Sequence, residues 1–508
     1  MTTRPDTVEL SSGTVRGLRS DAGCVVFRGI PYAAPPVGEL RWRAPAPVER
    51  WTGVRDATRP GNPAPQRAEA YASLDALDED CLYLEVTVPA RPADARPVLV
   101  WLHGGGGTNG SGSLYGAQRL ATIGDVIVVA PNYRLGVFGN FGYPGLANSG
   151  TFGLLDQQAV LRWVRREIRR FGGDPDNVTL CGESYGGLMV AAHLVSPASA
   201  GLFHRAILQS AFGVLGGVIP AHMLIPGLPA LPQRWVSVPE LERLGAATAV
   251  QHGWVQPDSD PESALEQLRR VPVAELLPVT GDFIRPAYGS AALPESAETA
   301  LPAGRFNRVP AIVGGTSDEA RFFVGLFGDL AGNPVTAESY TRMANEAFGA
   351  AAGEVLARYP VERFGTLSLA WARIATDRAW ALPAWELGQA LAQHVPTWFY
   401  DFADDDAPAP VPIPGMPTGA LHGSELRYQF DLPGLTPLPD PQRELAEQLN
   451  RYWTSFAAYG APATDGLPPW PRFDTGHVQR LAPGQLGGTD FVADHQLELW
   501  SGLDSGIS

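Results

Sequence analysis

The alternation of apolar and polar positions predicts short strands separated by amphipathic helices along most of the chain. Alternating residues with interspersed glycines predict small antiparallel strands over 8–28. Continuous apolar runs, typical of strands buried on both faces, lie at residues 82–88, 97–102, 126–130, 178–180, 206–208, 311–313 and 398–400. Helical spacing predicts helices over 155–171 and 442–459 and the start of another at 188–192. This order indicates a mostly parallel α/β sheet with helices on both faces.

Two further segments are expected to lie outside strands and helices. Asp-Pro-Asp-Asn at 174–177 predicts a turn before the strand that leads to Ser184, and the proline-rich stretch 407–417 predicts a loop. With 508 residues, 45% of them hydrophobic, the chain has ample material for a large core. Length alone suggests two or three domains, but large α/β enzymes often form one unit. We expect a single catalytic domain over 1–508.

Charge and cysteine content exclude several classes of function. The net charge is −15, from 38 basic and 53 acidic residues, which disfavours nucleic acid as a partner. All the basic residues are arginine, so no lysine is present for a Schiff base or a phosphate-binding loop. Three scattered cysteines form no C-x-x-C pair, so we expect no zinc or redox site. The chemistry that the motifs below predict needs neither a metal nor a cofactor. The N-terminus lacks an apolar signal segment and no run is long enough for a membrane span, which indicates a cytoplasmic protein.

The run Cys181–Gly187 contains the pattern G-x-S-x-G around Ser184. A serine in this pattern lies on a tight strand-to-helix turn with its hydroxyl exposed, and the flanking glycines are required because the turn leaves no room for Cβ atoms. An apolar strand precedes the motif and a helical segment follows it. The alternative is a glycine-rich turn with an incidental serine. The context favours a catalytic nucleophile.

A nucleophilic serine needs a base, and the base needs an orienting acid. In hydrolases with this turn the chain order is serine, acid, histidine. Among the histidines that follow the middle of the chain (His394, His422, His477 and His495), only His422 lies in a glycine-flanked loop after a strand. The acid is expected after the strand at 311–313, where Asp318 and Glu319 are both candidates on spacing alone.

The transition state of acyl transfer also needs donors for the developing oxyanion. The glycine run 104–107 follows a predicted strand, and its backbone N–H groups are suited to this role. A second donor would be the amide of Tyr185, directly after the serine. Phosphate sites also use glycine loops, but this one lacks the G-K-[ST] ending and the G-x-G-x-x-G pattern.

Several motifs together resemble the type-B carboxylesterase family of α/β hydrolases, which includes the cholinesterases. The resemblance covers nearly the whole chain and rests on segments 27–38, 79–84, 132–136 and 171–175 and on the serine, acid and histidine motifs. It implies an α/β-hydrolase fold with lid-like insertions and a serine carboxylesterase activity. By the family's motifs, Glu319 is the acid rather than Asp318. The assigned site residues are Ser184, Glu319 and His422 as the triad, Gly105, Gly106 and Tyr185 as the oxyanion hole, and Glu183 and Ser210 in support.

The sequence departs from the family at four positions. Tyr185 stands where a small residue usually follows the serine, and Gly107 replaces an aromatic residue that commonly follows the three glycines. Ala320 replaces the glycine that usually follows the acid. Secreted members pair the cysteine that matches Cys81 with one shortly upstream, and this chain has no such cysteine, which indicates a reducing compartment.

The substrate is expected to be a small, hydrophobic ester. An apolar, turn-rich stretch at 212–226 suggests a lid or acyl-pocket insertion within 211–240, or else a buried packing loop. The candidate pocket residues are Tyr71, Gly107, Phe212, Leu215, Phe322 and Phe323. Three alternatives stay open: an acyltransferase or lactone-forming enzyme on the same triad, a peptidase or amidase, and a non-catalytic binding protein. A monomer or small homo-oligomer is expected.

Overall fold

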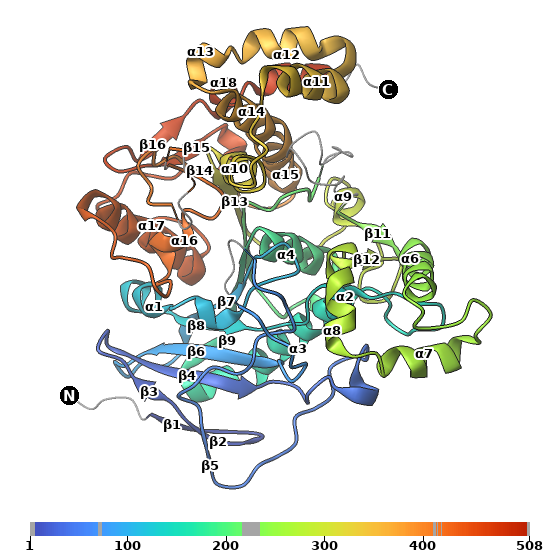
Figure 1. Cartoon of the computed structure of the whole chain (residues 1–508). Helices are drawn as coiled ribbons and strands as arrows, with labels where there is room; N and C mark the ends of the chain where they lie inside the picture. The colour runs from blue at the N-terminus through green and yellow to red at the C-terminus, as the bar shows by residue number, and fades with distance from the viewer. Residues whose placement is uncertain are drawn as a thin grey trace.

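An eleven-stranded sheet runs through the middle of the molecule (Figure 1). The structure is a computed structural model and describes residues 6–69, 74–215, 234–409, 413, 415–417 and 419–504. From one edge to the other the strands are β16 (Gly487–Thr489), β15 (Val478–Leu481), β14 (Thr397–Phe402), β13 (Ala311–Thr316), β10 (Arg205–Gln209), β9 (Gly173–Glu183), β7 (Arg96–Leu102), β8 (Ile127–Pro131), β6 (Tyr83–Pro89), β4 (Cys24–Pro31) and β3 (Leu18–Arg19).

The central strands of this sheet are parallel. Strands β8, β7, β9, β10, β13, β14 and β15 pair in parallel, whereas β6, β4 and β3 at one edge and β16 at the other are antiparallel to their neighbours. The mostly parallel α/β sheet predicted from the apolar runs is confirmed. Because parallel strands end at the same edge, the loops after β7, β9, β13 and β14 meet there.

Two small sheets flank the large one. Strands β1 (Thr7–Leu10) and β2 (Gly13–Arg16) pair antiparallel, and β5 (Val54–Asp56) runs parallel to β2. Strands β11 (Val236–Ser237) and β12 (Ala287–Tyr288) form a parallel pair. The small antiparallel strands predicted within 8–28 are therefore confirmed, as the pairs β1–β2 and β3–β4.

Helices cover both faces of the sheet, as the side chains of β7 illustrate. Val98, Val100 and Leu102 belong to the core under α3 and α4, and the intervening Leu99 and Trp101 to the core under α1 and α17. The helices are α1 (Gln118–Gly124), α2 (Gly136–Asn140), α3 (Phe152–Glu167), α4 (Tyr185–Val195), α6 (Val238–Gln251), α7 (Pro261–Arg269), α8 (Val273–Leu276), α9 (Ala297–Ala300), α10 (Glu319–Phe323), α11 (Ala337–Phe348), α12 (Ala352–Arg358), α13 (Val361–Phe364), α14 (Leu367–Thr376), α15 (Leu382–Ala392), α16 (Leu426–Gln429), α17 (Asp440–Tyr459), α18 (Phe491–Asp494) and α19 (Leu497–Asp504).

One local expectation is wrong. Residues 174–177, expected to form a turn, lie within β9. The register between β7 and β9 shifts after the Arg96–Gly173 pair and resumes at Val98 and Val178, so residues 174–177 form an irregularity of β9 that has no register partner in β7. The described residues of 407–417 form neither helix nor strand, as expected. Within the described part of the chain, no helix combines the length and apolarity that a membrane span requires.

Candidate active site

Ser184 lies at the sharp turn between β9 and α4. Its backbone has φ +55° and ψ −119°, a strained conformation for a residue with a side chain. A Cβ atom at Gly186 would lie 2.0 Å from the carbonyl oxygen of Leu102, and one at Gly182 would lie 2.5 Å from the carbonyl carbon of Gly186. The turn is therefore closed to side chains on both sides of the serine, which explains the G-x-S-x-G pattern.

Glu319 and His422 meet from two loops at the same edge of the sheet. Glu319 is the first residue of α10 and is buried. Its Oε1 accepts a hydrogen bond of 2.9 Å from the backbone N–H of Thr316, and its Oε2 lies 2.5 Å from Nδ1 of His422. The contact fixes the orientation of the imidazole ring.

Asp318, the other candidate acid, faces away from His422. Its carboxylate lies 2.8 Å from Arg321 and 4.0 Å from Arg373. Spacing alone left Asp318 and Glu319 open, whereas the geometry separates them: Glu319 contacts the histidine and Asp318 is held by two arginines.

The second nitrogen of His422 faces another carboxylate. Nε2 of His422 lies 3.2 Å from Oε1 of Glu183, and within the described residues no hydrogen bond joins His422 to the hydroxyl of Ser184. Burial disfavours the charged ring, but the charges of Glu183 and Glu319 outweigh burial and raise the pKa of His422 to about 9. Burial in turn raises the pKa of Glu183 to about 7. The protonation of His422 therefore depends on the charges of Glu183 and Glu319, and that of Glu183 depends on His422.

The glycine loop after β7 lies against the nucleophile. A Cβ atom at Gly104 would lie 3.1 Å from Cβ of Ser184. Gly105 and Gly106 have φ values of +101° and +65°, which favour glycine. Their N–H groups donate no hydrogen bond to another described residue. The loop thus brings unpaired donors beside the serine, the arrangement that an oxyanion hole requires.

Two departures from the family pattern compensate each other in space. A Cβ atom at Gly107 would lie 2.7 Å from Cε2 of Tyr185, so the tyrosine ring occupies the space over that glycine. The ring is buried, and its hydroxyl accepts a hydrogen bond of 3.1 Å from the side chain of Asn140. The large side chain after the serine and the missing one in the glycine loop therefore form a matched pair.

Aromatic rings extend from the histidine along one wall. The ring centre of Phe323 lies 4.9 Å from that of His422 and 5.3 Å from that of Trp380, and the Trp380 ring is tilted against Phe212 with the centres 4.6 Å apart. Phe322 lies 6.4 Å from His422. Two of the candidate pocket residues, Phe212 and Phe323, thus belong to this wall, and a third, Phe322, lies near His422.

The remaining pocket candidates lie elsewhere. Leu215 is buried in the core under α4, and Gly107 lies under Tyr185. Tyr71 is outside the described residues, as are residues 216–233 of the expected insertion 211–240. The described end of that insertion contains β11 and the start of α6, whose first turn is closed by a capping box between Ser237 and Glu240.

Sequence reasoning missed Trp380 and Arg234. The guanidinium carbon of Arg234 lies 4.0 Å from the centre of the Phe212 ring. Trp380 lies in the helical turn 377–381 and no motif marks it. A signal for Arg234 was present, because it is the only Asp, Glu, Lys or Arg between Arg205 and Glu240.

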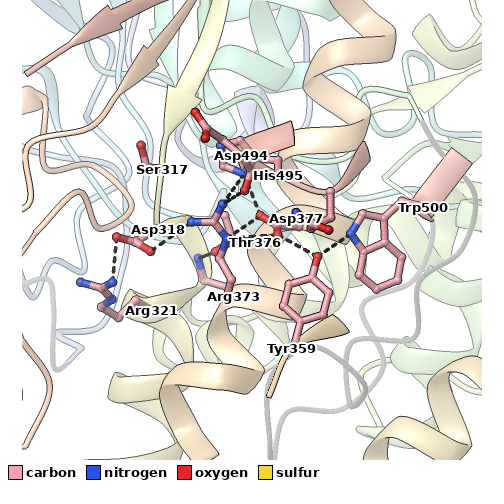
Figure 2. Close-up of polar contacts among 12 residues, drawn as sticks. Ser317, Asp318, Arg321, Tyr359, Arg373, Thr376, Asp377, Asp494, His495 and Trp500 are labelled. Atoms are coloured by element: carbon pink, nitrogen blue, oxygen red, sulfur yellow. Dashed lines mark hydrogen bonds and ion pairs between the residues drawn. The ribbon is translucent and has the colours of Figure 1, made fainter. Parts of the chain in front are cut away.

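Behind the acid loop lies a buried polar network (Figure 2). Figure 2 shows Arg373 between Asp318 and Asp377, with His495 and Tyr359 on the far side. Nδ1 of His495 lies 2.7 Å from Asp377, and the Tyr359 hydroxyl donates to Asp377 at 2.8 Å. Burial and Arg373 disfavour the charged ring, but Asp377 and Asp401 outweigh them and raise the pKa of His495.

Ser210 lines a small cavity that residues of the network and of the triad also line. Its Oγ is buried without a hydrogen-bond partner in the described residues. A cavity of about 20 Å³, room for one water molecule, is lined by Ser210, Glu319 and His495. The supporting role that the resemblance implies for Ser210 stays a prediction.

Comparison with known proteins establishes the family. The model described as "Carboxylesterase family" matches residues 4–500. The chain belongs to the carboxylesterase family. Its relatives include para-nitrobenzyl esterase of Bacillus subtilis, 34% identical with 91% of each chain covered, and cocaine esterase of Oryctolagus cuniculus, 33% identical with 91% of this chain and 89% of the relative covered. The resemblance drawn from the motifs is confirmed.

The solved structures agree. A PNB esterase superposes with a TM-score of 0.78 at 31% identity, with 97% of this chain and 99% of that chain covered. The protein is therefore an α/β hydrolase and a carboxylic ester hydrolase. Among the described residues, no group of histidine, cysteine and acidic side chains is arranged to hold a metal ion.

Proposed function

We propose that the protein hydrolyses small, hydrophobic carboxylic esters through an acyl-enzyme on Ser184, with His422 as base and Glu319 as the orienting acid. The observation that carries this proposal is the 2.5 Å contact between Glu319 and Nδ1 of His422 at the edge of the sheet where Ser184 turns outward. Ser184 attacks the ester carbonyl while His422 takes its proton. A small movement of the ring from Glu183 toward Ser184 forms the contact that this step needs; catalytic hydrogen bonds often tighten only with substrate bound.

The oxyanion is stabilised by the backbone. The N–H groups of Gly105, Gly106 and Tyr185 donate to the oxygen that becomes negative in the transition state. Glu319 stabilises the imidazolium of His422, which then protonates the leaving alcohol. Water attacks the acyl-enzyme with His422 again as base, and the acid is released. Each bond made and broken is accounted for by these residues and water.

The proposal extends to the form of the protein. The large sheet takes strands from residue 18 to residue 489, and this supports one catalytic unit over 1–508. All three cysteines are buried free thiols, and this supports a reducing compartment, the cytoplasm. We propose a monomer or small homo-oligomer.

The test is hydrolysis of p-nitrophenyl acetate, butyrate and octanoate by the parent and by Ser184→Ala. The parent is expected to be active and Ser184→Ala to lose about 10⁶-fold in kcat, the scale seen when a catalytic serine is removed. Ser12→Ala, on the turn between β1 and β2, is the matched control and is expected to match the parent. Equal activity of Ser184→Ala and the parent would contradict the assignment.

Acyl transfer on the same triad is the second candidate, because an alcohol can intercept the acyl-enzyme in place of water. Hydrolysis run with added butanol distinguishes the two. We expect the free acid as the main product. A dominant butyl ester at low butanol concentration would favour an acyltransferase. Hydrolysis of a p-nitroanilide is compared with that of the matching p-nitrophenyl ester to separate an esterase from an amidase. Much slower turnover of the anilide than of the ester indicates an esterase.

A further inference from the structure

Among the described residues, no acidic side chain forms an ion pair with Arg234. Its Nε is shielded from solvent and has no hydrogen-bond partner, and no ion pair joins the guanidinium to a described residue. The adjoining segment 216–233 contains neither aspartate nor glutamate. Burial lowers the pKa of Arg234 only to about 9, so the side chain is charged at neutral pH. A shielded, unpaired cation is costly to a fold, and its retention calls for an anion to bind it.

A row of aromatic rings leads from Arg234 to the catalytic histidine. Its guanidinium stacks on Phe212, and the rings of Phe212, Trp380 and Phe323 lead in contact to His422. Its charge also acts on the hydroxyl of Tyr185, the residue next to the nucleophile: burial raises the pKa of Tyr185 to about 12, and Arg234 opposes that rise. The cation thus stands at one end of an aromatic wall whose other end is the catalytic histidine.

We propose that Arg234 binds an ionised carboxylate of the substrate, so that the enzyme prefers esters carrying a second, anionic group. This inference rests on the ester hydrolase function proposed above and specifies its substrate class. The aromatic wall accommodates the apolar part of such a molecule, and the guanidinium pairs with its far end through two parallel N–H donors. Because the protein carries a net charge of −15, an anionic ester needs a local cation to bind near the serine.

A cation–π contact alone does not account for the arrangement. Stacking on Phe212 satisfies the face of the guanidinium, but it offers no acceptor to the N–H groups at its edge. Arg285 shows the ordinary solution in this chain. Its Nε is also buried without a partner, but its charge interacts with those of Glu240 and Asp282.

The experiment compares matched esters on the parent, Arg234→Gln and the control Arg285→Gln. Mono-p-nitrophenyl suberate against p-nitrophenyl octanoate places the carboxylate on the acyl side. 4-Acetoxybenzoate against 4-acetoxybenzamide places it on the alcohol side. The parent is expected to favour the anionic member of one pair, and Arg234→Gln to reduce that ratio of kcat/KM by about 10- to 100-fold, the range for charge-assisted hydrogen bonds. Arg285→Gln is expected to leave the ratio unchanged.

Three outcomes are informative in different ways. A ratio that falls in Arg234→Gln and is partly kept in Arg234→Lys supports the proposal. A second outcome is that the parent hydrolyses the neutral esters without preferring the anionic member of either pair, and that the ratio of kcat/KM is equal in Arg234→Gln and Arg285→Gln. This outcome would overturn the carboxylate site and leave the esterase function standing. No hydrolysis of any ester by folded parent protein would overturn both. If Arg234→Gln fails to fold, the parent alone is tested with suberate and octanamide as inhibitors. The proposal predicts inhibition by suberate but not by octanamide, and equal inhibition by the two compounds would contradict the proposal.

Discussion

The charge of Glu183 is expected to control the pH at which the enzyme becomes active. Its Oε1 lies 3.2 Å from Nε2 of His422, and the charges of both groups are spread over several atoms. For centres about 5 Å apart and an effective dielectric constant of about 20, Coulomb's law gives about 3 kcal/mol, or about 2 units in the pKa of His422. Since the pKa of His422 is raised to about 9, Glu183 is ionised in the range where the histidine titrates.

Glu183→Gln removes this charge while keeping the shape of the side chain. With one anion fewer, the imidazolium is less stable, so the pKa of His422 falls. The base must be neutral to accept a proton from Ser184. The acidic limb of kcat/KM for p-nitrophenyl butyrate is therefore expected near pH 9 in the parent and about 2 units lower in Glu183→Gln. The plateau above the limb is expected to drop, because the same charge stabilises the imidazolium in the transition state.

Glu425→Gln is the matched control. Glu425 is also buried and also raises the pKa of His422, but by less than Glu183 or Glu319. Its limb is expected to shift by less than that of Glu183→Gln. Equal shifts in the two variants, or a limb in Glu183→Gln that stays within half a unit of the parent or moves upward, would refute the reasoning from distance.

Three further predictions concern the acid loop, the serine turn and the buried network. Glu319→Gln is expected to lower kcat by about 10⁴-fold, as for other triad acids, whereas Asp318→Asn leaves it within about tenfold; equal losses would contradict the geometry. Gly186→Ala forces a Cβ atom to within 2.0 Å of a carbonyl oxygen and is expected to destabilise the fold by about 1–3 kcal/mol in urea unfolding. The raised pKa of His495 means that its pairing with Asp377 stabilises the fold fully below the ordinary histidine range and is lost as the pH rises. His495→Gln is therefore expected to cost about 3 kcal/mol at pH 6 and less at pH 9; a cost that grows with pH would show the sign to be wrong.

The sheet could be predicted from the sequence because its strands are buried on both faces. Such strands appear as continuous apolar runs, and the runs at 97–102 and 311–313 became β7 and β13. The turn expected at 174–177 was wrong because Pro175 and three polar residues indicate a break, whereas the segment lies within β9 as an irregularity between the Arg96–Gly173 and Val98–Val178 pairs with β7. A local turn signal does not show that a longer strand runs through the segment.

The candidate site could be predicted only as far as motifs reach. The G-x-S-x-G turn and the glycine-flanked histidine loop are visible in the sequence, so Ser184 and His422 could be proposed before the fold was known. Spacing alone could not choose between Asp318 and Glu319, because it does not say which way each side chain points; only the resemblance to the family favoured Glu319. Trp380 and Arg234 enter the site from segments about 200 and 50 residues away from Ser184, and only the packing brings them there.

The interlocking of Tyr185 with Gly107 constrains how this enzyme can evolve or be engineered. A larger residue at 107 collides with the ring, and a smaller residue at 185 leaves an unfilled space above the glycine loop. Each single substitution is therefore expected to destabilise the packing of this wall, whereas exchanging both residues together restores the packed volume. We therefore expect the effects of substitutions at the two positions to be non-additive. A mutant library that varies them one at a time would discard the combinations that reshape this wall, and one that varies them together would retain them.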